Sequence, residues 1–131
     1  MKNTVDIQIR VSYADTDQMG MVYYGNYLTY FERGRTEWLR NKGFTYRDME
    51  AEGIYLPVIE CACKYSAPAR YDDFITVRTG IAKLGPASVE FGYEILIDGK
   101  VLTTGTTKHP FVNRQFRPVR IPSRFKELFN D

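Results

Sequence analysis

The stretch that decides the fold is VSYADTDQMGMVYYGNYLTYFERGRTEWLR, residues 11–40. It continues a run in which apolar residues alternate, and this alternation predicts a strand with Val5, Ile7, Ile9, Val11 and Tyr13 on one face. A loop carrying Asp15, Asp17 and Gly20 follows. After Gly25 the spacing becomes helical, which predicts a helix whose buried stripe is Tyr27, Tyr30, Phe31, Gly34 and Trp38.

The loop that precedes this helix is a candidate reaction centre. The first N–H groups of a helix have no partner within the helix, so they can hold a polarised carbonyl oxygen. A carboxylate in the same loop can attack that carbonyl or activate water. Asp17 lies one loop before the helix start near Tyr24, so the pattern favours an acid and a main-chain donor acting together.

The remaining sequence predicts two short helices and four more strands. The long helix, from about Asn26 to Lys42, ends at Gly43, and Thr45 and Asp48 form a capping box for a short helix that reaches about Glu52. Strands are expected at residues 55–67, 74–84, 88–97 and 101–112, with an Asp98-Gly99 hairpin turn, and a last helix at 124–129.

This order predicts a single α+β domain spanning residues 1–131. The apolar helix needs an extended surface to cover it, and a curved antiparallel sheet of about five strands wrapped around one central helix provides that surface. Open edges of such a sheet are protected when two subunits pair them, so a homodimer is expected.

Composition limits the alternatives. The chain has 131 residues, 44% hydrophobic and 26% charged, and no apolar run approaches the roughly 20 residues that span a bilayer. The N-terminus lacks the apolar region of a signal peptide, so a cytoplasmic protein without a membrane span is expected. Net charge is +2, yet residues 108–126 hold six basic residues and no acidic one. This surplus fits substrate phosphates, nucleic acid, a subunit contact or a solvated surface.

The element order, together with the motifs YADTDQMGMVYYGNY and FERGRTEWLR, resembles the hotdog-fold acyl-CoA thioesterases. Within them it is similar to the subfamily typified by 4-hydroxybenzoyl-CoA thioesterase and the YbgC/FadM-like enzymes. The resemblance covers nearly the whole chain, including the late segments GTTKHPFVN and RPVRIP. It implies the hotdog architecture, a dimer or dimer of dimers, and hydrolysis of an acyl-CoA substrate. It also implies no metal or redox cofactor, coenzyme A being part of the substrate.

Two catalytic positions follow from this resemblance. Asp17 falls on the family's catalytic carboxylate, and Tyr24 falls where a backbone N–H faces the thioester carbonyl. Many bacterial members have His at the position of Tyr24. The Tyr keeps the amide donor but removes an imidazole proton shuttle. Asp17 can serve as nucleophile or as general base, and the sequence leaves both roles open.

Further residues are candidates for substrate binding. Around the loop and the helix entry these are Gly20, Val22, Tyr23, Gly25 and Tyr27. For the phosphates of coenzyme A they are Lys83, Ser88, Lys108 and Arg114.

The other acidic, histidine and cysteine residues have simpler explanations. Asp15 is expected to bond loop amides. A calcium loop is disfavoured, since Met19 stands where an oxygen ligand belongs. Glu32 and Glu37 are expected to pair with basic residues three positions later. Cys61 and Cys63 lack metal or redox spacing and are expected to be small apolar residues of a sheet.

Three rival functions stay open at this stage. A dehydratase or hydratase of acyl thioesters would need His109, the only histidine, which is otherwise expected to be a structural or interface group. A non-catalytic module that binds acyl-CoA or acyl carrier protein would need no catalytic acid. Nucleic-acid binding is disfavoured because the basic segment contains no recognisable reader motif.

Overall fold

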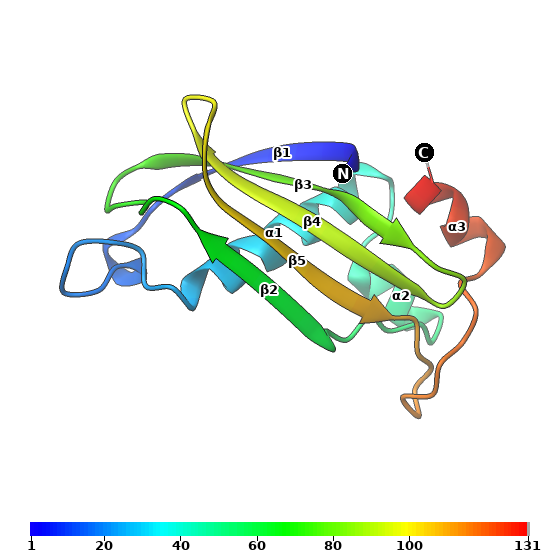
Figure 1. Cartoon of the computed structure of the whole chain (residues 1–131). Helices are drawn as coiled ribbons and strands as arrows, with labels where there is room; N and C mark the ends of the chain where they lie inside the picture. The colour runs from blue at the N-terminus through cyan, green and yellow to red at the C-terminus, as the bar shows by residue number, and fades with distance from the viewer. Residues whose placement is uncertain (131) are drawn as a thin grey trace.

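A computed structural model describes residues 1–130, and its elements follow the predicted order (Figure 1). The elements are β1 (Lys2–Arg10), a 3₁₀ turn (Tyr13–Asp15), α1 (Asn26–Asn41), α2 (Tyr46–Ala51), β2 (Glu60–Tyr65), β3 (Phe74–Leu84), β4 (Ser88–Ile97), β5 (Lys100–Pro110) and α3 (Ser123–Asn130). Among residues 1–130, no helix combines the length and the apolar character that crossing a membrane requires.

The strands form one antiparallel sheet in the order β1-β3-β4-β5-β2. In Figure 1 the sheet curves across one side of α1, which runs along its concave face. The predicted hotdog architecture is therefore confirmed. Within residues 1–130, β5 is the only strand that pairs with β2, which leaves β2 at the edge of the sheet.

The core lies between α1 and the sheet. All five residues of the predicted helical stripe are buried, and the Phe31 ring stacks on Tyr93 of β4 with centroids 4.3 Å apart. Trp38 is fully buried and its indole N–H donates to the Asn3 carbonyl at 2.6 Å. Burial of each such side chain stabilises the fold by roughly 2–3 kcal/mol, so this face fixes where α1 lies.

Two glycines allow α1 and its side chains to approach the sheet closely. A Cβ atom at Gly34 would lie 2.3 Å from Thr79 Oγ1, and a Cβ atom at Gly105 would lie 2.4 Å from the Phe31 ring and 2.9 Å from the Ala62 carbonyl. Neither contact leaves room for a methyl group. Glycine at these positions therefore sets the distance between helix and sheet.

Two predicted strand boundaries are wrong. Tyr13 does not share the buried strand face: it lies in the 3₁₀ turn and is 77% exposed. The predicted strand 55–67 is regular only from Glu60, because Pro57 has no N–H to donate. Tyr55 instead forms an isolated bridge to Val112.

Local signals are otherwise confirmed. The Thr45 side chain accepts from the Asp48 amide and Asp48 accepts from the Thr45 amide, which completes the capping box of α2. Asp98 and Gly99 both have positive φ, at 49° and 78°, as a tight two-residue hairpin turn requires.

The close approach at Gly105 gives the first prediction. Replacing Gly105 by Ala should lower the free energy of unfolding by about 1–3 kcal/mol, because the added methyl meets an aromatic ring and a main-chain carbonyl that cannot both move. Urea unfolding measures the change. Thr29→Ala, on the exposed side of α1, is the control and should change stability by less than about 0.5 kcal/mol. A Gly105→Ala variant as stable as the control would contradict this account of the packing.

Candidate active site

The loop between β1 and α1 is folded by its own main chain. Thr16 and Val22 form an antiparallel bridge, and the Asp17 amide donates to the Met21 carbonyl at 2.8 Å. Gly20 turns the chain back with φ of 76°, a conformation that costs glycine little. The loop is thus a small hairpin that holds Asp17 at a defined place.

Asp15 fastens this loop to α1. Its carboxylate accepts from the Tyr30 hydroxyl at 2.9 Å and from the Ser12 amide at 3.3 Å. Its carbonyl accepts from the Asn26 side chain and from the Tyr23 amide. Burial, together with the bond to Asp15, raises the pKa of Tyr30, so this phenol stays a donor. The predicted structural role of Asp15 is confirmed.

Asp17 has a different environment. Its side chain is half-buried, and one carboxylate oxygen accepts from the Met19 amide at 2.9 Å. Asp17 lines a cavity of about 310 Å³ together with residues of the helix entry, Val22, Tyr24 and Tyr27. Asp15 is therefore bonded to neighbouring parts of the fold, whereas Asp17 faces a cavity.

The start of α1 leaves two main-chain donors free. The amides of Asn26, Tyr27 and Leu28 donate to the carbonyls of residues 23, 24 and 25. The amides of Tyr24 and Gly25 make no hydrogen bond to any of residues 1–130. Tyr24 lines the same cavity as Asp17. An acid and an unpaired amide at a helix N-terminus thus occur at one cavity, which is the arrangement that acyl transfer needs.

The far wall of the cavity comes from a segment that the sequence analysis did not assign to the site. It consists of Tyr65, Ser66, Ala67 and Pro68, at the end of β2 and just after it. The Tyr65 hydroxyl donates to the Tyr24 carbonyl at 2.9 Å. Tyr65 and Tyr24 are 41 positions apart, so no local sequence pattern predicts their contact. An aromatic residue near the end of a strand was the signal that could have been considered.

The structure brings only some predicted binding residues to the cavity. Val22 and Tyr27 line it, and the Tyr27 hydroxyl accepts from the Ala69 amide at 3.2 Å. Gly20, Tyr23 and Gly25 are in the loop and helix entry but do not line it. Tyr23 packs beside Tyr24 with ring centroids 4.6 Å apart.

The predicted phosphate-binding residues are grouped at the other end of the sheet. They are Lys83 at the end of β3, Ser88 at the start of β4, Lys108 near the end of β5 and Arg114 in the loop beyond it. Lys108 pairs with Glu60 at the start of β2, whereas Tyr65 is at the finish of that strand. Five strand steps separate them, about 16 Å. One chain therefore does not place these residues beside Asp17.

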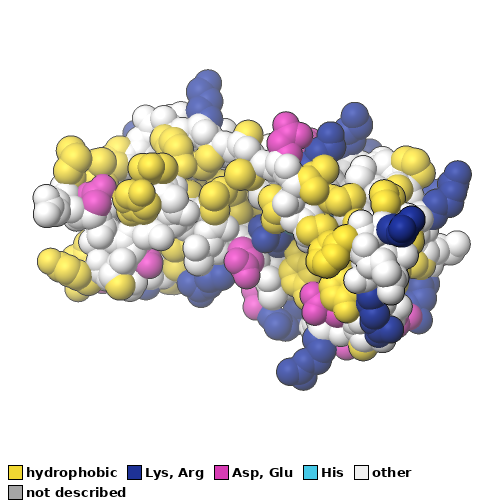
Figure 2. All heavy atoms as spheres, turned by 90° about the horizontal axis from the view of Figure 1, so that it is seen from below, with side chains coloured by type: hydrophobic (Ala, Val, Ile, Leu, Met, Phe, Trp, Pro, Cys, Tyr) yellow, Lys and Arg dark blue, Asp and Glu magenta, His cyan; other side chains and the backbone are white. Residues whose placement is uncertain are grey.

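Exposed apolar side chains surround the cavity end. Figure 2 shows hydrophobic side chains over the end that carries the β1–α1 loop and a second group on the other half of this face, where Lys and Arg side chains are most numerous. The large exposed residues near the cavity end are Tyr13, Met19, Tyr23, Tyr24, Tyr65, Tyr71 and Phe74. Such a concentration is typical of a binding or subunit surface.

His109 is a structural group. It is fully buried on β5, and its Nδ1 lies 3.0 Å from the Leu56 carbonyl. A carbonyl only accepts, so Nδ1 carries the proton and Nε2 accepts from the Thr107 hydroxyl at 2.8 Å. Thr107 in turn accepts from the Tyr93 hydroxyl at 2.5 Å. His109 does not line the Asp17 cavity, so the structure does not support the dehydratase arrangement.

The acids on α1 differ from each other. Glu37 pairs with Arg40 as predicted. The predicted Glu32–Arg35 pair is wrong, since no such contact exists within residues 1–130. The Arg35 guanidinium turns inward instead, where it donates to the Tyr46 hydroxyl at 3.1 Å.

Cys61 and Cys63 are free thiols on β2, exposed and half-buried respectively.

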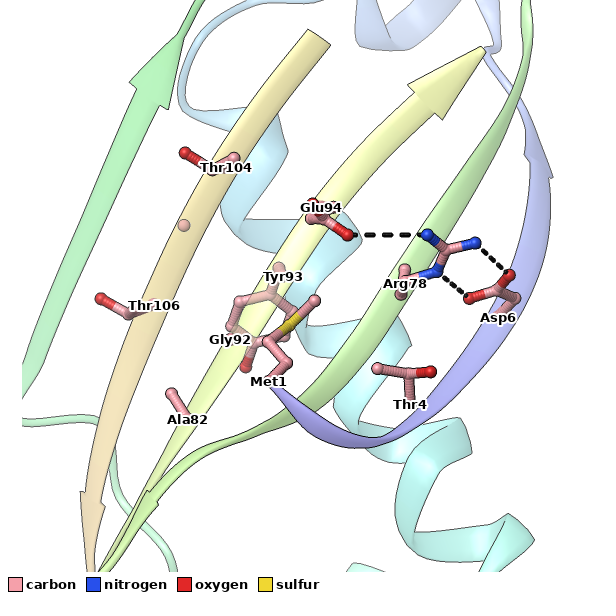
Figure 3. Close-up of a pocket in the computed structure, with 11 residues that line it drawn as sticks. Met1, Thr4, Asp6, Arg78, Ala82, Gly92, Tyr93, Glu94, Thr104 and Thr106 are labelled. Atoms are coloured by element: carbon pink, nitrogen blue, oxygen red, sulfur yellow. Dashed lines mark hydrogen bonds and ion pairs between the residues drawn. The ribbon is translucent and has the colours of Figure 1, made fainter. Parts of the chain in front are cut away.

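A larger hollow of about 800 Å³ lies on the face of the sheet away from α1 (Figure 3). Its charged residues are already paired: Arg78 donates to both carboxylate oxygens of Asp6, at 2.9 and 3.1 Å, and lies 3.7 Å from Glu94. Met1 covers Gly92 at its floor. This hollow contains no free acid beside a helix start. Residues 1–130 also contain no cluster of three His, Cys, Asp or Glu side chains suited to a metal ion.

The chain resembles known proteins both in sequence and in structure. The family model described as "Thioesterase-like superfamily" matches residues 11–129. The acyl-CoA thioesterase YbgC of Haemophilus influenzae is 32% identical over 132 residues, which is 99% of this chain and 97% of the relative. A DHNA-CoA thioesterase from Staphylococcus aureus superposes with a TM-score of 0.90 at 32% identity, over 96% of this chain and 88% of the other. A hypothetical protein from Aquifex aeolicus superposes with a TM-score of 0.92 at 31% identity, over 96% and 99%.

The buried histidine gives the second prediction. Burial first, and the charge of Arg35 second, lower the pKa of His109 from 6.5 to about 4. The unfolded chain therefore binds a proton between pH 6.5 and 4 that the folded chain does not. The stability that neutral His109 supplies is complete above pH 6.5 and should fall by about 3 kcal/mol as the pH drops to 4.

The measurement is chemical unfolding between pH 4 and 8 for the protein and for His109→Gln. Carboxylates titrate in both proteins, so the difference between their curves isolates His109. Parallel curves would contradict the lowered pKa.

Proposed function

The chain belongs to the thioesterase-like superfamily, and from that premise we propose that it hydrolyses acyl-CoA thioesters to a carboxylic acid and free coenzyme A. The observation that carries the proposal is the shared cavity of Asp17 and Tyr24. Relatives that cover almost the whole chain bear the name acyl-CoA thioesterase. No metal or redox cofactor takes part in this proposal, because a thioester is already an activated acyl donor.

Hydrolysis needs a carboxylate and an N–H donor for the oxyanion, both close to the same thioester carbonyl. The thioester carbonyl oxygen accepts from the Tyr24 amide, which has no other partner in residues 1–130. Loss of one such donor typically costs about 3–4 kcal/mol of barrier. The positive end of the α1 dipole adds to the same field. Placement of the helix start therefore matters as much as the acid.

Asp17 completes the reaction in one of two ways. As a nucleophile, it forms an anhydride with the acyl group, expels the coenzyme A thiolate and is released by water. As a general base, it takes a proton from water that attacks the carbonyl directly. In both cases one oxygen stays bound to the Met19 amide at 2.9 Å while the other is available. Both roles agree with the half-buried position of this carboxylate.

A homodimer is part of the proposal. β2 has only one neighbour in the sheet, and exposed apolar residues Leu28, Val58 and Ile59 lie on α1 and just before β2. Pairing β2 with β2 of a second copy about a two-fold axis covers this edge and reverses the second sheet. The basic end of one copy then lies toward the cavity end of the other, where Lys83, Lys108 and Arg114 can meet substrate phosphates. A dimer of dimers would use surfaces that this edge leaves free.

The free thiols Cys61 and Cys63 suit a reducing compartment. We therefore place the proposed activity in the cytoplasm.

The alternative function is an acyl-CoA or acyl-carrier-protein binding module. The same cavity would hold the acyl group in that case. The unpaired amide beside a carboxylate favours hydrolysis, because binding alone requires neither group. Saturable binding of acyl-CoA without thiol release would identify the module.

The third prediction tests the acid. Asp17→Asn keeps the size of the side chain and removes its charge, so kcat should fall at least about 100-fold. Release of free thiol from a panel of acyl-CoA substrates measures the activity. Asp98→Asn, at the β4–β5 turn, removes an exposed carboxylate that does not line the cavity, at a position of positive φ that Asn also tolerates, and it should keep wild-type activity. An Asp17→Asn enzyme with most of its activity would remove Asp17 from the mechanism.

The fourth prediction tests the edge strand. The protein should have a mass in solution of twice that of one chain or a multiple of that dimer. Val58→Asp puts a charge into the proposed contact and should raise the dissociation constant at least tenfold, as analytical ultracentrifugation measures. Val101→Asp, at the β4–β5 hairpin, is the matched control. A monomeric wild-type protein would contradict the dimer.

A further inference from the structure

The residue that carries the candidate oxyanion donor is held on one side by its own helix. The Asn26 amide donates to the Tyr23 carbonyl at 2.8 Å, which orients the peptide group that ends in the Tyr24 N–H. The carbonyl of Tyr24 has a weaker helical partner, the Tyr27 amide at 3.4 Å. The first turn of α1 therefore leaves one side of Tyr24 loosely bound.

Tyr65 supplies the missing contact from a different part of the fold. Its hydroxyl donates to the Tyr24 carbonyl at 2.9 Å, across 41 positions of sequence. This is a better hydrogen-bond length than the 3.4 Å helical contact. The sheet is thus bonded directly to the residue at the helix entry.

The Tyr65 ring is itself held in place. It packs edge-on against Tyr27 with centroids 5.1 Å apart, and Tyr27 is buried in the core and accepts from the Ala69 amide. Tyr65 is 45% exposed, but the partial loss of water around its hydroxyl and the contact with Cys63 raise the pKa of this phenol above its usual value, so it stays protonated and can donate near neutral pH. The donor is available and its direction is fixed.

We propose that Tyr65 is a positioning residue of the active site: its hydroxyl fixes the Tyr24 carbonyl, which shares a peptide group with the Gly25 N–H, and so holds the Tyr24 backbone in the conformation in which the free N–H groups of the helix entry point to the thioester carbonyl. The inference rests on the proposed function for its kinetic consequence, but the contact itself belongs to the fold. Tyr65 touches no reacting atom in this account. It acts through the main chain of Tyr24, and its effect is on the reaction step rather than on substrate affinity.

The fifth prediction uses Tyr65→Phe, which keeps the ring against Tyr27 and removes only the hydroxyl. Loss of one hydrogen bond that orients a catalytic donor should lower kcat about tenfold. KM should stay within about twofold, since the cavity wall is unchanged. The factor in kcat should be the same for short and long acyl-CoA substrates, because the carbonyl is common to all of them. A wall that merely shapes the acyl pocket would give a factor that changes with chain length.

Two further variants separate the hydroxyl from the ring. Tyr65→Leu loses both, so its kcat should fall at least as far as that of Tyr65→Phe. Tyr55→Phe is the control: Tyr55 pairs with Val112 beyond the far end of β5, does not line the cavity, and its hydroxyl bonds to none of residues 1–130. It should keep wild-type kcat and KM. A Tyr65→Phe enzyme with wild-type kcat, or a loss confined to KM, would overturn the proposal.

A structural readout makes the test independent of the chemistry. In Tyr65→Phe the amide resonances of residues 24–27 should shift and exchange with solvent faster, while residues remote from both position 65 and the helix entry should be unchanged. If these resonances do not move, Tyr65 does not position Tyr24. If the wild type is active, Asp17→Asn is inactive and Tyr65→Phe is normal, the proposed function stands and only this inference fails.

Discussion

The structure depends on the close contact of one helix with a curved sheet. Gly34 and Gly105 permit that contact, and the stacked rings of Phe31 and Tyr93 fill it. A helix placed by its side chains along its whole length has its first turn placed as well. The core therefore sets where the N-terminus of α1 lies, and the bonds from Asp15 and Tyr65 then hold its first residues. The packing of the core thereby determines where the free amides of the helix entry lie.

The two acids of the motif have different surroundings. Asp15 accepts from Tyr30 and Ser12, so its carboxylate holds the loop against the helix. Asp17 has a single amide donor and faces a cavity. Both bonds to the Asp15 side chain go to one carboxylate oxygen, so hydrogen bonding alone does not separate the two acids; what separates them is that Asp17 lines the cavity and Asp15 does not. Because the two acids are only two residues apart, the hydrogen bonds of Asp15 also limit where Asp17 can lie.

The sequence was sufficient to predict the parts that depend on local pattern. The helical stripe from Tyr27 to Trp38, the capping box at Thr45 and the turn at Asp98-Gly99 are all as expected. Prediction failed where tertiary contacts decide. Arg35 does not pair with Glu32, its neighbour on the helix, but donates to the half-buried hydroxyl of Tyr46. The cavity wall around Tyr65 depends on how β2 lies beside the helix start, and no spacing in the chain encodes that distance.

The position of β2 joins the site to the assembly of the protein. This strand has one sheet neighbour, carries Tyr65 at its end, and has its free edge where a second copy is proposed to pair. An edge strand held from one side has more freedom than an internal strand, because half of its main-chain groups lack partners. Pairing of that edge reduces this freedom and thereby fixes the hydroxyl that holds Tyr24. The same strand would then set both the assembly and the geometry at the helix entry. A weakened subunit contact should therefore change the conformation of the helix entry before it changes the packing of the core.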